Sequence, residues 1–296
     1  MNQFRLLITM LCVLTLAALA SGCLSWDSGW TQAGKSGTGG DVRTLLDKAA
    51  VLERDADSDG KVKQLIAVYE DVLKADPENR KALDELGALY MLLGYGYDKS
   101  RDEKETHYRK ALQYCERRMY LNNKFRELVD GGEDTWDAAG ELSKDEMYAL
   151  YFWYLSVGNY WLDCFSTPAK VLNASWTGRA NRVLKHINDI DPDFHHGAVA
   201  YMWAVYYASI PGIMGRDLER SVEYFNSALQ KGPTMTNFLV GRAKYLHTKK
   251  NDRDAFMADI NRVLSIDPVK VPMIYPWAVY HYNDAKKMRA EVDRYF

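Results

Sequence analysis

Apolar residues recur at helical spacing along this 296-residue chain from about residue 41 to its C-terminus, most clearly at 198–229. No charged residue occurs between Ala198 and Ile210. A helix that is apolar on every side must be covered on several sides or line an enclosed space. After Pro211 and Gly212, which end that helix, apolar residues return at steps of three and four beside charged ones. The stretch therefore predicts an antiparallel hairpin of one deeply buried helix and one half-exposed helix.

The rest of the chain repeats this arrangement. The pattern predicts helices or helical hairpins at 45–73, 82–112, 144–163, 168–190, 237–247, 252–264 and 275–296. The helix at 144–163, like the one that begins at Ala198, is apolar on every side. The sequence shows no convincing alternation of apolar and polar residues with a period of two, so strands are not expected.

Prolines mark the ends of several of these helices. Pro192, Pro233 and Pro268 each follow an aspartate or a glycine, and they lie 41 and 35 residues apart. This spacing brackets the period of about 34 residues that tetratricopeptide repeats have. The punctuation therefore favours a helical-repeat architecture.

The segment 82–112 fits such a repeat most closely. The small residues Gly87 and Ala111 allow close contact between its two helices, but the turn at 95–103 is longer than the repeat requires. We therefore predict an all-α domain over residues 41–296, built as a solenoid of degenerate tetratricopeptide-like helical hairpins with extended turns.

The N-terminal residues form a separate segment. Arg5 precedes an apolar run of 15 residues at 6–20, which is shorter than a membrane span. The run ends in Leu-Ala-Ser-Gly-Cys, and small residues before a cysteine at this place resemble the lipobox of bacterial lipoproteins. The resemblance implies that residues 1–22 are a signal peptide and that Cys23 becomes lipidated. The alternative is an ordinary signal peptide with an incidental cysteine.

A lipid on Cys23 would anchor the protein to a membrane without spanning it, on the periplasmic side. Leu24 is not an aspartate, so the resemblance implies the outer membrane in a cell that has one. Residues 23–40 contain the lipidated cysteine and a segment rich in glycine and serine, which we predict to be a flexible tether. Trp26 and Trp30 within it are expected either at the lipid interface or in solvent.

Composition narrows the classes of function. The chain is 47% hydrophobic and 26% charged, as folded globular proteins are, and its formal net charge is −2. This charge does not suggest a nucleic-acid partner or electrostatic binding to a membrane. The sequence contains no glycine-rich phosphate loop, no Gly-x-Ser-x-Gly and no His-Glu-x-x-His. We therefore expect neither an enzyme nor a cofactor.

Histidine and cysteine residues also argue against a metal site. His195 and His196 are adjacent, so on a helix they would point apart, and no third ligand stands at a metal-binding spacing. Cys115 and Cys164 are the two cysteines after Cys23, and both lie in apolar helical stretches. They could form a disulfide in an oxidising compartment or pack as free thiols, and the sequence leaves both alternatives open.

The order of the motifs resembles one known family. The segments ALYFWYLSVGNYWLD, INDIDPDFHHGAVAYMWAVYYASIPGIMGRDLERSVEYFNSAL and FMADINRVLSIDP, followed by a terminal helix, look like the TRAP transporter T-component (TatT) family over about residues 45–296. The turn pattern of that family is matched at Pro211, Gly215, Asp217, Phe225, Ala228 and Leu229. Arg216 replaces its second glycine and Ser221 replaces its alanine.

The resemblance implies a function in transport. Members of this family are periplasmic helical-repeat lipoproteins that bind the solute-binding protein of a TRAP (tripartite ATP-independent periplasmic) system. They can assemble as homotrimers and are suggested to handle a hydrophobic small molecule. The alternative function is a tetratricopeptide scaffold lipoprotein in outer-membrane or envelope assembly, with no ligand.

The two helices that are apolar on every side carry more tyrosine and tryptophan than one solenoid layer needs to bury. We therefore predict that part of this set lines a ligand- or partner-binding cavity or groove, the candidates being Tyr151, Trp153, Tyr154, Trp161, Tyr201, Trp203 and Tyr207. The alternative is a dry aromatic core.

Overall fold

The computed structural model describes residues 24–32 and 40–296, and these ranges contain helices and connections but no strand. The predicted all-α class is confirmed. The main helices are α2 (Val42–Glu53), α3 (Asp59–Ala75), α4 (Arg80–Leu92), α5 (Arg101–Tyr120), α6 (Asn123–Asp130), α7 (Thr135–Ala138), α8 (Met147–Cys164), α9 (Thr167–Leu172), α10 (Ser175–Ile190), α11 (Phe194–Ser209), α12 (Leu218–Lys231), α13 (Thr236–Gly241), α14 (Thr248–Lys250), α15 (Arg253–Leu264) and α16 (Tyr275–Ala290).

Local sequence explains where many of these helices begin and approach one another. The side chains of Asn79, Asp217 and Asp252 accept hydrogen bonds from backbone N–H groups at the starts of α4, α12 and α15. A Cβ at Gly87 would lie 2.7 Å from the Cys115 sulfur, so this glycine lets α4 approach α5 closely. The long turn expected at 95–103 is shorter in the structure, because α4 continues as a π-helical segment.

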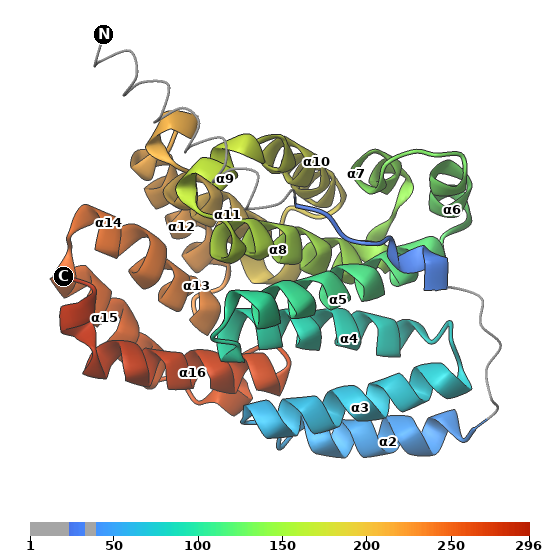
Figure 1. The fold of residues 1–296 in the computed structure, drawn as a ribbon. Coiled ribbons are helices and arrows are strands. Elements are labelled where there is room, and N and C mark those ends of the chain that lie inside the picture. The colour runs from blue at the N-terminus through green and yellow to red at the C-terminus, as the bar shows by residue number, and fades with distance from the viewer. Residues whose placement is uncertain (1–23, 33–39) are drawn as a thin grey trace, which may run out of the picture.

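Neighbouring helices pack side by side along the chain, but the predicted solenoid is not confirmed. The last long helix, α16, returns to the first third of the chain (Figure 1). The indole nitrogen of Trp277 in α16 donates to the carbonyl oxygen of Ala88 in α4 over 3.2 Å, and the rings of Trp277 and Tyr95 lie 5.8 Å apart. The chain therefore closes on itself around an interior space, whereas an open solenoid keeps its ends apart.

Residues 24–32 lie along the folded body, in blue in Figure 1. Leu24 is buried and its N–H donates to Asn173 Oδ1 over 3.0 Å. Trp26 packs against Trp153 and Trp176, and Trp30 stacks on Tyr120. The prediction of a flexible tether is therefore wrong for this part of residues 23–40, and both tryptophans are half-buried against aromatic rings of the folded body. Cys23, the predicted signal peptide at 1–22 and residues 33–39 lie outside the described residues.

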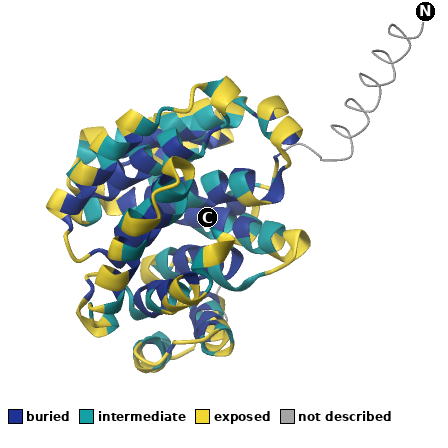
Figure 2. Ribbon diagram, turned by 90° about the vertical axis from the view of Figure 1, so that its left-hand side faces the viewer, coloured by how far each residue is buried: buried dark blue, intermediate teal, exposed yellow. Residues whose placement is uncertain are grey.

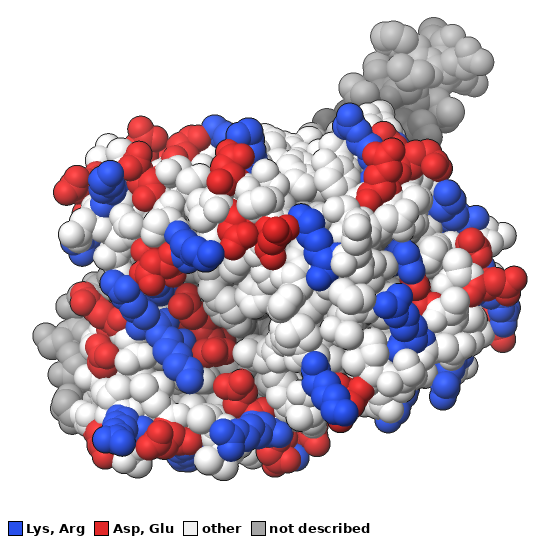
Figure 3. Space-filling view, turned by 180° about the vertical axis from the view of Figure 1, so that it is seen from behind, with Lys and Arg blue, Asp and Glu red and all other residues white. Residues whose placement is uncertain are grey.

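Buried residues occupy the centre of the helical body, and exposed ones lie on its outer turns (Figure 2). The face shown in Figure 3 carries acidic and basic side chains interspersed, around a hollow whose surface is uncharged. Within residues 24–32 and 40–296, no helix combines the length and the hydrophobicity that crossing a membrane requires.

Candidate functional site

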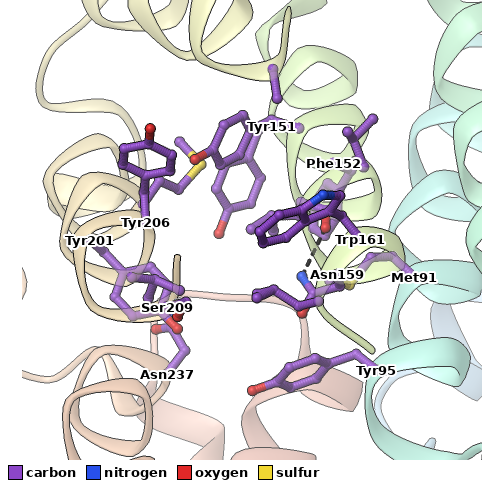
Figure 4. Close-up of a pocket in the computed structure, with 18 of the residues that line it drawn as sticks. Met91, Tyr95, Tyr151, Phe152, Asn159, Trp161, Tyr201, Tyr206, Ser209 and Asn237 are labelled. Atoms are coloured by element: carbon purple, nitrogen blue, oxygen red, sulfur yellow. Dashed lines mark hydrogen bonds between the residues drawn. The ribbon is translucent and has the colours of Figure 1, made fainter. Parts of the chain in front are cut away.

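The helices surround a cavity of about 180 Å³ (Figure 4). Its wall takes side chains from α4, α8, α10, α11, α13 and α16 and from two π-helical segments. One water molecule needs roughly 10–15 Å³ measured in this way, so the space is sufficient for a small organic ligand or a cluster of waters.

Helix α8 is apolar on every side because neighbouring helices cover some of its faces and the cavity lies against the rest. Helices α4, α5 and α10 pack against it, and its remaining face lines the cavity. The residues of that face recur at steps of three and four, as one side of a helix requires: Tyr148, Tyr151, Leu155, Gly158 and Leu162. Tyr154 and Trp161 border the same face. The pattern that suggested an enclosed helix therefore has two causes, packing and a cavity.

The structure brings four of the seven predicted aromatic residues together at the cavity. They are Tyr151, Tyr154, Trp161 and Tyr201, and each is buried. In Figure 4, Tyr201 and Tyr206 come from α11 on one side of the space, and Trp161 and Asn159 come from α8 on the other. Burial raises the pKa of the tyrosine hydroxyls at 151, 154 and 201, so these groups remain uncharged.

The other three predicted residues do not line the cavity. Trp153 is fully buried on the opposite side of α8, where its indole nitrogen donates to Glu116 over 3.2 Å. Trp203 and Tyr207 are half-buried on the outer side of α11 and pack against Tyr224 of α12. The sequence could not separate these three residues from the lining ones. A helix that is apolar on every side does not indicate which side faces a space.

An unusual backbone conformation begins α11. His195, His196 and Gly197 have φ angles of 43°, 58° and 99°, all in the left-handed region. The left-handed conformation costs free energy in residues other than glycine, and two such residues in succession are rare. Such conformations are found mostly at functional sites. It places the His195 ring 5.8 Å from that of Tyr151, in a stacked arrangement at the cavity wall. Burial and the neighbouring His196 lower the pKa of His195.

Two π-helical segments each supply a tyrosine to the cavity. They are η2 (Leu93–Tyr97), which carries Tyr95, and η6 (Arg242–His247), which carries Tyr245. π-Helical turns occur often at functional sites, since the extra residue redirects side chains. A period of 3.6 residues does not reveal such a turn, so the sequence pattern missed both tyrosines.

Helix α16 completes the wall with Trp277 and His281. His281 is 3% exposed, and burial together with the charge of Lys244 lowers its pKa to about 3. The segment Tyr275–Tyr282, which lacks charged residues, is the signal that could have marked this helix as a second candidate. Only the return of α16 to α4 brings it to the cavity.

The polar groups in this wall include tyrosine, serine and threonine hydroxyls, amides and imidazoles, and several make no hydrogen bond. The cavity-lining residues of the described chain include no lysine, arginine, aspartate or glutamate. Four of them keep a buried polar atom without a hydrogen-bond partner in the described structure: Asn181 Oδ1, Ser209 Oγ, Asn237 Oδ1 and His281 Nδ1. Such atoms are normally paired in folded proteins, and groups without partners call for an explanation.

The family-like turn lies beside this site. Pro211 follows α11, Gly215 adopts a φ of 91°, and Asp217 caps α12 by accepting from the N–H of Arg220 over 2.9 Å. Phe225 is fully buried and packs edge-on against Tyr201. Arg216 donates to the carbonyl oxygen of Ile210 over 3.1 Å, so the substituted position also holds the turn together. The turn thus supports the cavity wall through Tyr201.

Cys115 and Cys164 are both buried and both free. Burial raises the pKa of both thiols, so they are unreactive packing residues in this structure. The described residues contain no group of three or more histidine, cysteine, aspartate or glutamate side chains placed to hold a metal ion.

Residues 61–296 match the family of the TRAP transporter T-component. Because the match covers most of the chain, the protein belongs to this family, and the resemblance seen in the sequence is confirmed. A comparison with curated proteins found no match. The family is one of transporter components rather than enzymes, and it points to the cell envelope as the place of action.

Proposed function

We propose that this protein is the T-component of a TRAP transport system, anchored to a membrane through lipid on Cys23, and that it holds an apolar ligand in the cavity between α8, α11 and α16. The observation that carries the proposal is the cavity itself, in a chain of this family. Its wall is largely aromatic and aliphatic, as in small-molecule sites. The docking of Leu24 on Asn173 supports an anchor that holds the body close to the membrane.

The second part of the proposal is that the TRAP solute-binding protein docks on the outer side of α11 and α12. The half-buried rings of Trp203, Tyr207 and Tyr224 form a surface cluster there, and Arg220 lies over Tyr207 at 5.3 Å. Aromatic residues and arginine are enriched at protein interfaces and supply much of their binding energy. Two of the residues predicted for ligand or partner binding therefore have a role away from the cavity.

Affinity capture of the tagged, full-length lipoprotein from gently solubilised envelopes tests this function. We expect mass spectrometry to recover a TRAP-type solute-binding protein, and Tyr207→Ala to reduce that recovery several-fold. Tyr282→Ala is the matched control, because Tyr282 is also half-buried and carries a cation, Lys286, 4.5 Å from its ring. Recovery of outer-membrane assembly proteins without a solute-binding protein would contradict the proposal and favour the tetratricopeptide scaffold.

A further inference from the structure

The cavity also restricts the chemistry of its ligand, an inference that rests on the proposed ligand-binding function. A charged ligand would find no counter-charge in the wall, because no acidic or basic side chain of the described chain lines it apart from two histidines whose pKa values are lowered. Burying a charge without a partner is far more costly than burying a neutral polar group.

The nearest buried cation does not change this conclusion. Lys244 contacts two lining tyrosines, with its ammonium 5.1 Å from the ring centre of Tyr95 and 5.5 Å from that of Tyr245. The pKa of Lys244 is raised, first by Tyr245 and then by the buried carboxyl group of Asp284. Burial raises the pKa of Asp284, and Lys244 acts against that shift. Lys244 is not among the residues that line the space.

The four unpaired polar atoms of the wall residues favour a hydrogen-bond donor. Asn181 Oδ1 and Asn237 Oδ1 can only accept. The Ser209 hydroxyl can donate or accept, and His281 Nδ1 accepts when it carries no hydrogen. None of the four has a partner within the described residues. Asn237 and His281 are 8% and 3% exposed, and the unpaired atoms themselves have almost no accessible surface, so a small rotation of each side chain is needed to present them to a ligand in the cavity. Figure 4 shows Ser209 and Asn237 together on the side of the cavity that carries Tyr201.

We infer that the ligand is an uncharged molecule with an apolar skeleton that bears hydroxyl or amide N–H groups, and that Ser209, Asn237 and His281 accept hydrogen bonds from those groups. The aromatic and aliphatic wall binds the skeleton through burial of apolar surface. The unpaired acceptors select the molecule, because a ligand without donors leaves them unsatisfied.

Three probes with one skeleton test this inference: 4-cyclohexylphenol, its methyl ether and 4-cyclohexylbenzoate. Binding is measured by equilibrium dialysis against the full-length lipoprotein in lipid nanodiscs, with empty nanodiscs as the reference for partitioning. An unmade buried hydrogen bond lowers affinity roughly five- to hundredfold. We expect the phenol to bind at least about fivefold more tightly than the ether, and the benzoate to bind most weakly.

Two serine variants provide a matched comparison. Ser209→Ala removes an unpaired hydroxyl at the cavity, and Ser156→Ala removes an equally buried, unpaired hydroxyl of α8 that does not line it. Only Ser209→Ala should reduce the preference for phenol over ether. Equal binding of phenol and ether, tighter binding of the benzoate, or equal effects of the two variants would overturn the inference and leave the ligand-binding function standing. Failure of all three probes to bind would overturn both.

Discussion

Two groups of buried polar atoms, one on each side of α8, differ in how they are paired. On the side toward α5, the carboxylate of Glu116 is 1% exposed and accepts from Trp26, Gly29, Thr135 and Trp153 over 2.8–3.3 Å. On the other side, four polar atoms of the cavity wall make no hydrogen bond within the described structure. A satisfied network stabilises one conformation, whereas unpaired groups beside an open space are suited to a ligand.

This difference between the two sides of α8 also separates two tryptophans of the helix by their contacts. Trp153 and Trp161 stand on the same helix, yet the first donates to Glu116 and the second borders the cavity. Trp26 contacts both regions, because its ring lies 6.1 Å from that of Trp153 and 5.0 Å from that of the cavity residue Trp176. Residues 24–32 therefore belong to the hydrogen-bonded network around Glu116, and Trp26 also packs against α10, which forms part of the cavity wall.

The largest expected effect comes from removing the acceptor on the satisfied side. Glu116→Leu leaves Trp153 and Thr135 as buried donors without a partner and releases Trp26 and Gly29. Each unsatisfied buried donor costs about 1–3 kcal/mol, so we expect the free energy of unfolding to fall by about 3 kcal/mol. Urea denaturation measures this change. A loss below about 1 kcal/mol would show that the network does not hold the fold.

The same carboxyl group predicts a dependence on pH. Burial raises the pKa of Glu116 from 4.5 to about 6, although its four hydrogen bonds act in the opposite direction. The folded state then retains the proton over a range in which the unfolded state has lost it, so stability is greatest below the lower value and declines as the pH rises to about 6. The difference between the pKa of Glu116 in the folded and the unfolded state corresponds to about 2 kcal/mol of folding stability.

Glu116→Gln, which cannot ionise, is the reference for that measurement. We expect the stability of the native chain relative to this variant to fall by about 2 kcal/mol between about pH 3.5 and about pH 7, and to be constant above that range. Denaturation at a series of pH values follows the difference. A flat difference would mean that the hydrogen bonds compensate the burial of this carboxyl group.

A smaller effect is expected when a new side chain fills part of the cavity. A Cβ at Gly158, in the cavity face of α8, meets no atom within 4 Å, and the same holds for Gly178 of α10, which does not line the cavity. Gly158→Leu should lower the affinity for 4-cyclohexylphenol about tenfold, equivalent to about 1.4 kcal/mol, because the new side chain occupies the space. Gly178→Leu should leave it unchanged, and equal losses would place the probe elsewhere.

The smallest effect expected is that of pH on ligand binding. His281 has a pKa lowered to about 3, and the wall contains no carboxylate or amine in the described chain. The affinity for 4-cyclohexylphenol should therefore change less than about twofold between pH 5 and pH 8. Dialysis over this range measures it, and a steep loss toward pH 5 would indicate that a cavity histidine becomes protonated.

The sequence by itself determined the helices and part of the cavity. Apolar spacing, capping residues and prolines set the helical hairpins, because these signals act within a few residues. The excess of aromatic residues on α8 and α11 indicated Tyr151, Tyr154, Trp161 and Tyr201. It also indicated Trp153, Trp203 and Tyr207, since an all-apolar helix does not specify which side meets a neighbour and which meets a space.

Only the tertiary structure decided the rest. Residues 24–32 look like a linker by composition, yet long-range contacts with Glu116 and Asn173 dock them on the body. The return of α16 to α4 closes the chain and adds Trp277 and His281 to the cavity. Both outcomes depend on residues more than 80 positions apart meeting in space. Local periodicity cannot encode such meetings, because they follow from how whole helices pack.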